Sequence, residues 1–142
     1  MTDMQAAMGR EQLKRLPSML ERRRCLAARY SEKLSAIPGV GVPTEPPWGH
    51  SNWQSYCVRL PEWCDQRSVM QKLLDCGIST RRGVMCAHRE PVYARMPQCV
   101  RFPLTESEGV QDRMVILPLY HQMTEAEQGR VVDILGDACA GH

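Results

Sequence analysis

The sequence has 142 residues, of which 43% are hydrophobic and 24% are charged, and its formal net charge is +2. The hydrophobic and charged fractions lie near the averages of globular proteins, and the net charge is small. This composition excludes a disordered, a fibrous or a strongly charged chain. No apolar run approaches the ~18 residues of a membrane-spanning helix, and the N-terminus lacks the basic and apolar tracts of a signal peptide. We therefore expect a cytoplasmic protein with one domain, residues 1–142, and no membrane partner.

The first 37 residues predict a long helical segment, which we expect to be the scaffold of the fold. Thr2 and Gln5 have the spacing of a capping box, in which each side chain accepts a hydrogen bond from the other residue's backbone N–H. Apolar residues then recur three, four or seven positions apart as far as Ile37. Pro17 lies between two such stripes, so we expect either a kink or a second helix that begins there.

Three strands are expected beyond a loop rich in proline. Alternating apolar and polar residues predict strands over residues 52–60 and 78–86, and a short apolar run predicts another over residues 114–119. With so many helices between them, these strands predict an α+β fold. It would have a small, mostly antiparallel three-stranded sheet with helices packed on one face.

Helices are expected between the strands and at the end. Asp65 can cap one helix, and residues 90–96 predict a short one. Two further helices should begin at capping boxes, which are the pairs Thr105/Glu108 and Thr124/Glu127. The last helix is expected to fray from Gly136.

Arg22, Arg23 and Arg24 form the one concentrated run of charge. Three successive residues of a helix point in different directions, so we interpret the run as a solvated face. A surface for nucleic acid is the alternative, but no basic stripe continues it elsewhere in the sequence. We therefore expect no nucleic-acid partner.

Six motifs, spread over nearly the whole chain, resemble one family. They are MTDMQAAMG, SYCVRL, GISTRR, HREPVY, FPLTES and ILPLYHQMTEAEQ, in this order. Together they resemble the C-terminal domain of the DegT/DnrJ/StrS-type aminotransferases, which use pyridoxal phosphate (PLP) to aminate nucleotide-linked keto sugars. The resemblance implies a small domain of that kind, with residues 1–37 as its helical scaffold and residues 52–142 as its α+β sandwich.

The resemblance places the cofactor machinery outside this sequence. In the family a lysine forms the Schiff base with PLP and an aspartate pairs with the pyridinium nitrogen, and both lie in a large N-terminal domain. An Asn and an Arg that approach the cofactor phosphate precede the TDMQAA segment in the family and are absent here. The lysines of this chain, Lys14, Lys33 and Lys72, lie on predicted helices among polar residues, so we expect surface side chains. We predict no catalytic and no cofactor-binding residue in this chain; PLP belongs to the full-length family.

The resemblance also implies that the loop after the second strand reaches a nucleotide sugar at a dimer interface. The matching stretch begins with Arg81 and Arg82, and a guanidinium group can donate two parallel hydrogen bonds to phosphate oxygens. The alternative is that both are ordinary charges at a strand edge, and one of two neighbouring strand residues must point away from any site. Many relatives carry His-Tyr-Pro where this chain has Gly83, Val84 and Met85, so the resemblance does not indicate which sugar is bound.

His88 matches a later histidine of the same loop, and the resemblance implies a substrate contact. The alternative is a histidine that caps a helix or holds the end of a loop through a hydrogen bond. Cys86 and His88 are two metal-type ligands without a second pair, and the seven cysteines form no CxxC motif, so we predict no metal site. Tyr120 and His121 lie in a turn that we expect to position the last helix.

Two functions remain open at this point. The first is a C-terminal domain, or a separately encoded fragment, of a PLP-dependent nucleotide-sugar aminotransferase. It would contribute a wall of the substrate site and dimer contacts, and would not be competent alone. The second is a stand-alone module for dimerisation or small-ligand binding, derived from that domain. The expected partners are a second copy or a large-domain chain, together with the nucleotide sugar. Met4, Met8 and Met19 would suit an adaptable interface, although core packing is the commoner role of methionine.

Overall fold

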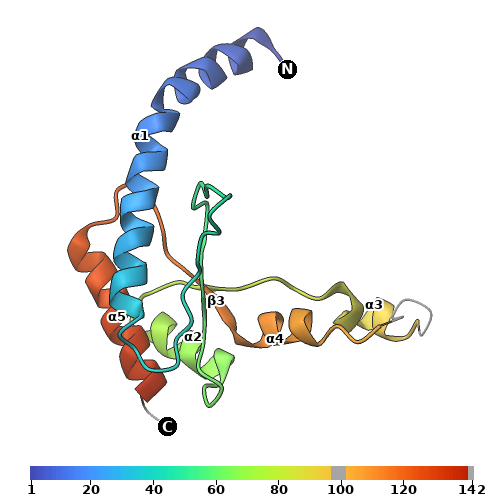
Figure 1. Ribbon diagram of the computed structural model, residues 1–142. Coiled ribbons are helices and arrows are strands. Elements are labelled where there is room, and N and C mark those ends of the chain that lie inside the picture. The colour runs from blue at the N-terminus through green and yellow to red at the C-terminus, as the bar shows by residue number, and fades with distance from the viewer. Residues whose placement is uncertain (97–101, 141–142) are drawn as a thin grey trace.

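The computed structural model describes residues 1–96 and 102–140, and Figure 1 shows their arrangement. The elements are α1 (Asp3–Leu34), β1 (Tyr56–Arg59), α2 (Gln66–Asp75), β2 (Arg81–Arg82), the 3₁₀ helix η1 (Ala87–Arg89), α3 (Pro91–Ala94), α4 (Thr105–Arg113), β3 (Met114–Leu117) and α5 (Glu125–Ala140). The predicted α+β class with a three-stranded antiparallel sheet is confirmed. None of the described helices combines the length and the apolar character needed to cross a membrane.

α1 is a single helix that begins at the predicted capping box. Gln5 donates its backbone N–H to Thr2 Oγ1 (3.3 Å), and Thr2 donates its own to Gln5 Oε1 (2.9 Å). The helix continues through Pro17, so the prediction of a second helix beginning there is wrong. Figure 1 shows instead that the ribbon curves in its N-terminal half, as the loss of a backbone hydrogen bond at proline allows.

The two halves of α1 lie in different surroundings. Leu26, Tyr30 and Leu34 in the C-terminal half are fully buried. In the N-terminal half, Met4 is 75% exposed and Leu13 is 66% exposed. Figure 1 shows why, because this half extends away from the rest of the chain. The long helix therefore packs along only part of its length.

The sheet has the strand order β1–β3–β2, and both pairings are antiparallel. Residues that pair across an antiparallel ladder share a face, and successive residues alternate between faces. One face therefore carries the buried pairs Tyr56/Leu117 and Val58/Val115, while Cys57 and Ile116 pair on the other face and are only partly buried. The sheet thus has one covered face and one more exposed face.

All three strands are shorter than the predicted ranges 52–60, 78–86 and 114–119. Before β1, Trp53 has a left-handed backbone φ of 48° and donates its N–H to Ser51 Oγ (3.0 Å), so the chain turns there. After β2, Gly83 donates its N–H to the carbonyl of Met114 (3.0 Å). A Cβ at Gly83 would lie 3.0 Å from Met114 Cβ, so this close approach needs glycine.

Helices α1, α2 and α5 form the core with the covered face of the sheet. α5 contacts both α1 and α2, and α2 also contacts β3. Fully buried side chains come from every one of these elements; examples are Leu26, Tyr30, Tyr56, Val58, Leu73, Val115 and Leu135. The helices thus pack on one face, as the sequence predicts.

Most of the predicted helix ends are confirmed. Asp65 Oδ2 accepts the backbone N–H of Ser68 (2.8 Å) at the start of α2. At the start of α5, Glu127 donates its N–H to Thr124 Oγ1 (3.2 Å) and accepts that of Thr124 (2.7 Å). The expected fraying from Gly136 is wrong, since α5 continues to Ala140 and buries Cys139.

The predicted capping box of Thr105 and Glu108 is also wrong. The residue that precedes α4 is Leu104, and no side chain caps it. Glu108 instead interacts with His88 and Arg89. The Glu108 side chain therefore binds His88 and Arg89 and does not cap the start of α4.

Residues 84–96 and 102–113 form an extension that we call the arm, and it contains η1, α3 and α4. Figure 1 shows the arm reaching sideways from the sheet, on the side away from α5. Its base is the direct passage from α4 into β3. The arm and the N-terminal half of α1 are the two parts that leave the body of the fold.

Candidate functional site

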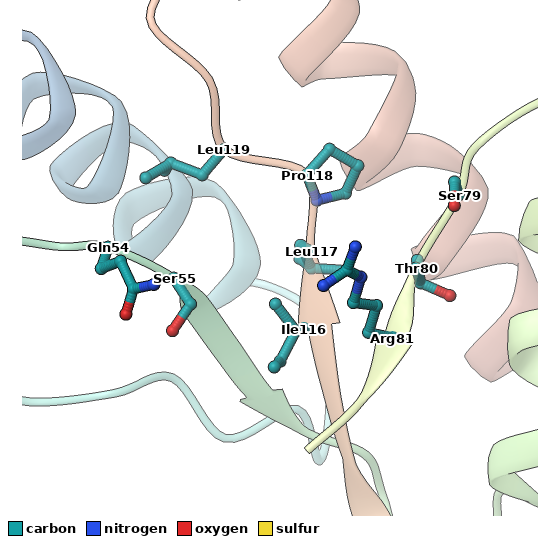
Figure 2. A pocket seen from close by; sticks show the side chains of 9 residues that line it. All are labelled: Gln54, Ser55, Ser79, Thr80, Arg81, Ile116, Leu117, Pro118 and Leu119. Atoms are coloured by element: carbon teal, nitrogen blue, oxygen red, sulfur yellow. The ribbon is translucent and has the colours of Figure 1, made fainter. Parts of the chain in front are cut away.

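A pocket of about 500 Å³ lies on the exposed face of the sheet, and we call it the open-face pocket. The register explains its position, because Arg81 pairs with Ile116 and both therefore point to the face that the helices do not cover. Figure 2 shows the Arg81 side chain extending from β2 toward β3, in the middle of the pocket. The full lining is Gln54, Ser55, Ser79, Thr80, Arg81, Ile116, Leu117, Pro118 and Leu119.

The open-face pocket combines one cation with several neutral polar groups. Gln54 and Ser55 lie at its β1 side, and Ser79 and Thr80 lie at its β2 side (Figure 2). Arg81 forms no ion pair with any residue that the structure describes. A free guanidinium group next to hydroxyl and amide groups suits the recognition of a phosphate or diphosphate, because it can donate two parallel hydrogen bonds.

Arg82 does not belong to this pocket. It pairs with Val115, whose side chain is fully buried on the covered face, so Arg82 points to the helix side of the sheet. The structure thus separates the two arginines, as the alternation of strand residues predicts. A role in substrate binding stays a prediction for both of them.

His88 lies in the arm, apart from Arg81, and is held by its neighbours. Its Nε2 donates to the carboxylate of Glu108 (2.8 Å), and Arg89 reaches the other oxygen of that carboxylate (3.2 Å). Arg89 also bonds Asp112 (2.6 Å). The hydrogen-bonded histidine that the sequence left open is therefore present. A substrate contact of His88 stays a prediction, and it would involve a second pocket.

That second pocket, which we call the arm pocket, has a volume of about 800 Å³ and a mostly apolar lining. Val84, Met85 and Tyr93 line it, and they are 70%, 62% and 47% exposed. Cys86 is buried at its edge, where its Sγ donates to the carbonyl of Ser107 (3.2 Å). Such a surface suits an apolar partner more than a phosphate.

The stability of the fold at acidic pH should depend on the protonation of Glu108. Hydrogen bonds from His88 and then from Arg89 lower the pKa of this carboxyl from its ordinary 4.5. A lowered folded-state pKa stabilises the fold above the unfolded value and loses that contribution as the pH falls through the folded value. Urea unfolding of Glu108→Gln should therefore show reduced stability near neutral pH. The difference from the wild type should shrink as the pH falls below the ordinary carboxyl value and disappear below the lowered folded-state pKa.

Glu106→Gln is the matched control for this prediction. Glu106 lies on the same helix, is exposed and takes part in none of the ion pairs among the described residues. Its stability should follow the wild type at every pH. An equal, pH-independent loss in both variants would show that the Glu108 network contributes nothing to folding.

The lysines of the chain do not fit a PLP site. Lys14 is 67% exposed and pairs with Glu11 on the same helix. Lys72 is exposed and donates to the carbonyl of Asp137 (2.7 Å), and Lys33 is exposed as well. A Schiff-base lysine needs a desolvated pocket, and these are all the lysines in the sequence. We therefore assign no step of cofactor chemistry to the described residues.

No metal centre is formed by residues 1–96 and 102–140, since no three His, Cys, Asp or Glu side chains come together there.

The arginine run of α1, Arg22 to Arg24, has a different role from the expected solvated face. Its three side chains are partly buried and donate to backbone carbonyls of distant loops: Arg22 to Met123 (2.6 Å), Arg23 to Trp53 and Gln54 (both 2.9 Å), and Arg24 to Ser51 (3.4 Å). These arginines fasten the loops to α1.

Sequence reasoning missed most of the open-face pocket. The alternation of residues predicts strand positions for Ser55, Ser79 and Thr80, but it does not reveal their pairing partners. The GISTRR motif does contain three of the lining residues, Ser79, Thr80 and Arg81. The residues just before β1 and those at and after the end of β3 join them only through the sheet register.

Comparison with known proteins gives one family and one kind of relative. Residues 1–136 match the DegT/DnrJ/EryC1/StrS aminotransferase family. The chain is 37% identical over 142 residues to a dTDP-4-dehydro-2,3,6-trideoxy-D-glucose 4-aminotransferase of Saccharopolyspora spinosa. That alignment covers 99% of this chain and 35% of the relative.

Solved structures agree with the sequence match. The aminotransferase TlmJ from Streptoalloteichus hindustanus is similar with a TM-score of 0.82 and 26% identity, over 95% of this chain and 35% of that one. DesI, solved in the presence of its TDP-sugar product, gives a TM-score of 0.83 and 30% identity, over 96% and 35% of the two chains. The chain thus spans 35% of the length of each of these relatives. It belongs to the DegT/DnrJ/EryC1/StrS aminotransferase family.

Proposed function

We propose that this chain is the C-terminal domain of a PLP-dependent nucleotide-sugar aminotransferase, either as part of a longer protein or as a separately encoded piece. Its own contribution is one wall of the substrate site, and the cofactor is held by another domain or chain. Family membership and the 35% span of the relatives support this division of labour. The exposure of all three lysines supports it as well.

The observation that carries the proposal is the position of Arg81 in the open-face pocket. Its guanidinium group stands among hydroxyl and amide groups and has no carboxylate partner in the described chain. A diphosphate is the part of a nucleotide sugar that such a group recognises best. DesI, a relative with 30% identity, was solved with a TDP-sugar product. We therefore assign the diphosphate of a nucleotide sugar to the open-face pocket.

Exposed apolar side chains supply the second part of the proposal. Met4, Met8 and Leu13 are 75%, 65% and 66% exposed on the projecting half of α1. The arm pocket adds a second apolar surface. We propose that these two surfaces contact the large domain or a second copy, since apolar patches of this kind are usually covered.

The same exposure favours one alternative function. A stand-alone module that dimerises through α1 and binds a small ligand would also expose this stripe in a single chain and cover it in the dimer. The two functions differ in ligand affinity. A domain that forms only one wall of a substrate site should bind the nucleotide sugar weakly when it is isolated. A stand-alone module should bind its ligand tightly without another domain or chain.

A titration with dTDP-glucose, followed by amide NMR of the 142-residue chain, tests the proposed function. Amide signals of Ser55, Thr80 and Arg81 should shift, with a dissociation constant on the order of 1 mM. Arg81→Gln removes a charge-assisted contact and should weaken binding by roughly tenfold.

Arg59→Gln is the matched control, because Arg59 lies on the same face of the sheet but outside the open-face pocket. It should leave the dissociation constant unchanged. An unchanged dissociation constant in Arg81→Gln would contradict the proposed site. Binding at about 1 μM by the isolated chain would favour the stand-alone module over the domain.

A further inference from the structure

Arg82 lines a different pocket from Arg81, and the proposed function assigns no role to that pocket. The pocket has a volume of about 570 Å³ and lies between β2 and one side of α2. We call it the α2–β2 pocket. Its α2 residues are Arg67, Met70, Gln71 and Leu74, which are spaced three, four and seven positions apart and so form one stripe of the helix.

Two guanidinium groups line the α2–β2 pocket, Arg67 from α2 and Arg82 from β2. Neither pairs with a carboxylate among the described residues, whereas Arg29, Arg89 and Arg113 all do. Two positive charges at one pocket repel each other, and a bound anion would attract both and offset that repulsion. The pocket therefore presents two guanidinium groups without a direct ion-pair partner among the described residues.

The acidic residues of α2 and its cap are already engaged. Asp65 accepts hydrogen bonds from Ser68 N and Ser68 Oγ, both at 2.8 Å. Asp75 accepts one from Gln71 Nε2 at 2.7 Å. Hydrogen bonds from Ser68, and after them the charge of Arg67, lower the pKa of Asp65, so Asp65 partly offsets the charge of Arg67. Neither Arg67 nor Arg82 forms a direct ion pair with a carboxylate of the described residues.

The remaining lining fits an organic phosphate. Ser79 and Thr80 carry hydroxyl groups at the edge of β2, where they line both this pocket and the open-face pocket. Leu74 is 55% exposed and, with Met70, gives an apolar side on which a carbon skeleton could lie. Guanidinium groups bind phosphate oxygens through paired hydrogen bonds.

We propose that the α2–β2 pocket is a second anion site, which binds a phosphate-bearing small molecule through Arg67 and Arg82. It lies on the opposite side of β2 from the open-face pocket. The two pockets share only Ser79 and Thr80, and each has its own arginines. The second site does not depend on the proposed aminotransferase role.

Inorganic pyrophosphate is the probe, added to the 142-residue chain at constant ionic strength and followed by amide NMR. Signals of Arg67, Gln71 and Arg82 should shift and saturate. Arg67→Gln and Arg82→Gln should each weaken binding by roughly tenfold, and the double variant should abolish it. Arg82→Lys keeps the charge without the planar fork and should give an intermediate loss.

Arg10→Gln removes one positive charge from the exposed, projecting half of α1 and is the charge-matched control. It should leave the dissociation constant that the Arg67, Gln71 and Arg82 signals report unchanged. Equal weakening by Arg10→Gln would reduce the effect to overall charge and overturn the proposal. Shifts confined to the open-face pocket would overturn it as well, while leaving the proposed function intact. Unchanged thermal unfolding of the arginine variants would exclude loss of fold as the cause.

Discussion

Replacing Leu26 by alanine should lower the free energy of unfolding by about 2–5 kcal/mol. Leu26 lies in the C-terminal half of α1, is fully buried and belongs to the core cluster that joins α1, α5 and the sheet. The substitution removes buried methyl groups and leaves a cavity that the surrounding side chains fill only in part. Urea unfolding followed by circular dichroism measures the loss.

Leu13→Ala makes the same chemical change thirteen residues earlier in the same helix. Leu13 is 66% exposed, so this variant should change stability by less than about 0.5 kcal/mol. A loss that grows with protein concentration would instead show that a second copy covers the projecting half of α1. Equal losses in both variants at every concentration would contradict the packing of α1 described above.

The same division within α1 shows what sequence periodicity can and cannot establish. Apolar spacing predicts two stripes with Pro17 between them, and one helix, from Asp3 to Leu34, carries both. The stripes themselves do not say what covers them. The C-terminal half of the helix packs on the sheet and α5, while the N-terminal half has no cover within the described chain.

Local signals were reliable where no distant group competed. The capping boxes at Thr2 and Thr124 formed as predicted, because both partners lie within one turn and are exposed. The third, at Thr105, did not form, because Glu108 binds His88 and Arg89 from the other side of the arm. That pairing spans about twenty residues of sequence separation, and no local pattern reveals it.

The predictions of the strands and of the site both lacked the same information, which is how the strands pair. Alternation correctly implied that Arg81 and Arg82 point to opposite faces. It did not show that β2 would contain only these two residues. Nor could it show that Ser55, directly before β1, lines the same pocket, because that depends on the pairing of both strands with β3.

Gln66→Leu is the second substitution with a large expected effect, about 1–3 kcal/mol of stability. Gln66 is 7% exposed, and its Nε2 donates to the carbonyls of Gln111 (2.9 Å) and Met114 (2.8 Å). Gln111 lies in the last turn of α4, which leaves carbonyl acceptors without intrahelical partners, and Met114 begins β3. Leucine has a similar volume but no donor, so the Gln111 carbonyl would lose this partner, while the Met114 carbonyl would keep the N–H of Gly83 (3.0 Å).

Gln71→Leu is the matched control on the same helix. Gln71 is exposed and donates only to Asp75, a contact across one helical turn, so its replacement should cost less than about 0.5 kcal/mol. Gln66→Glu gives a sharper test, because it keeps the shape and turns a carboxylate toward two carbonyl oxygens. At neutral pH it should be more destabilising than Gln66→Leu, since a buried charge then lacks a donor.

The loss in Gln66→Glu should decrease in acid. Surrounding carbonyl oxygens and burial favour the protonated form, so the pKa of the introduced carboxyl is raised in the folded state. Its protonated form can again donate one hydrogen bond, and the folded state therefore gains relative stability as the pH falls through that raised value. Equal costs for Gln66→Leu and Gln71→Leu, or a pH-independent cost for Gln66→Glu, would mean that this side chain does not hold the base of the arm.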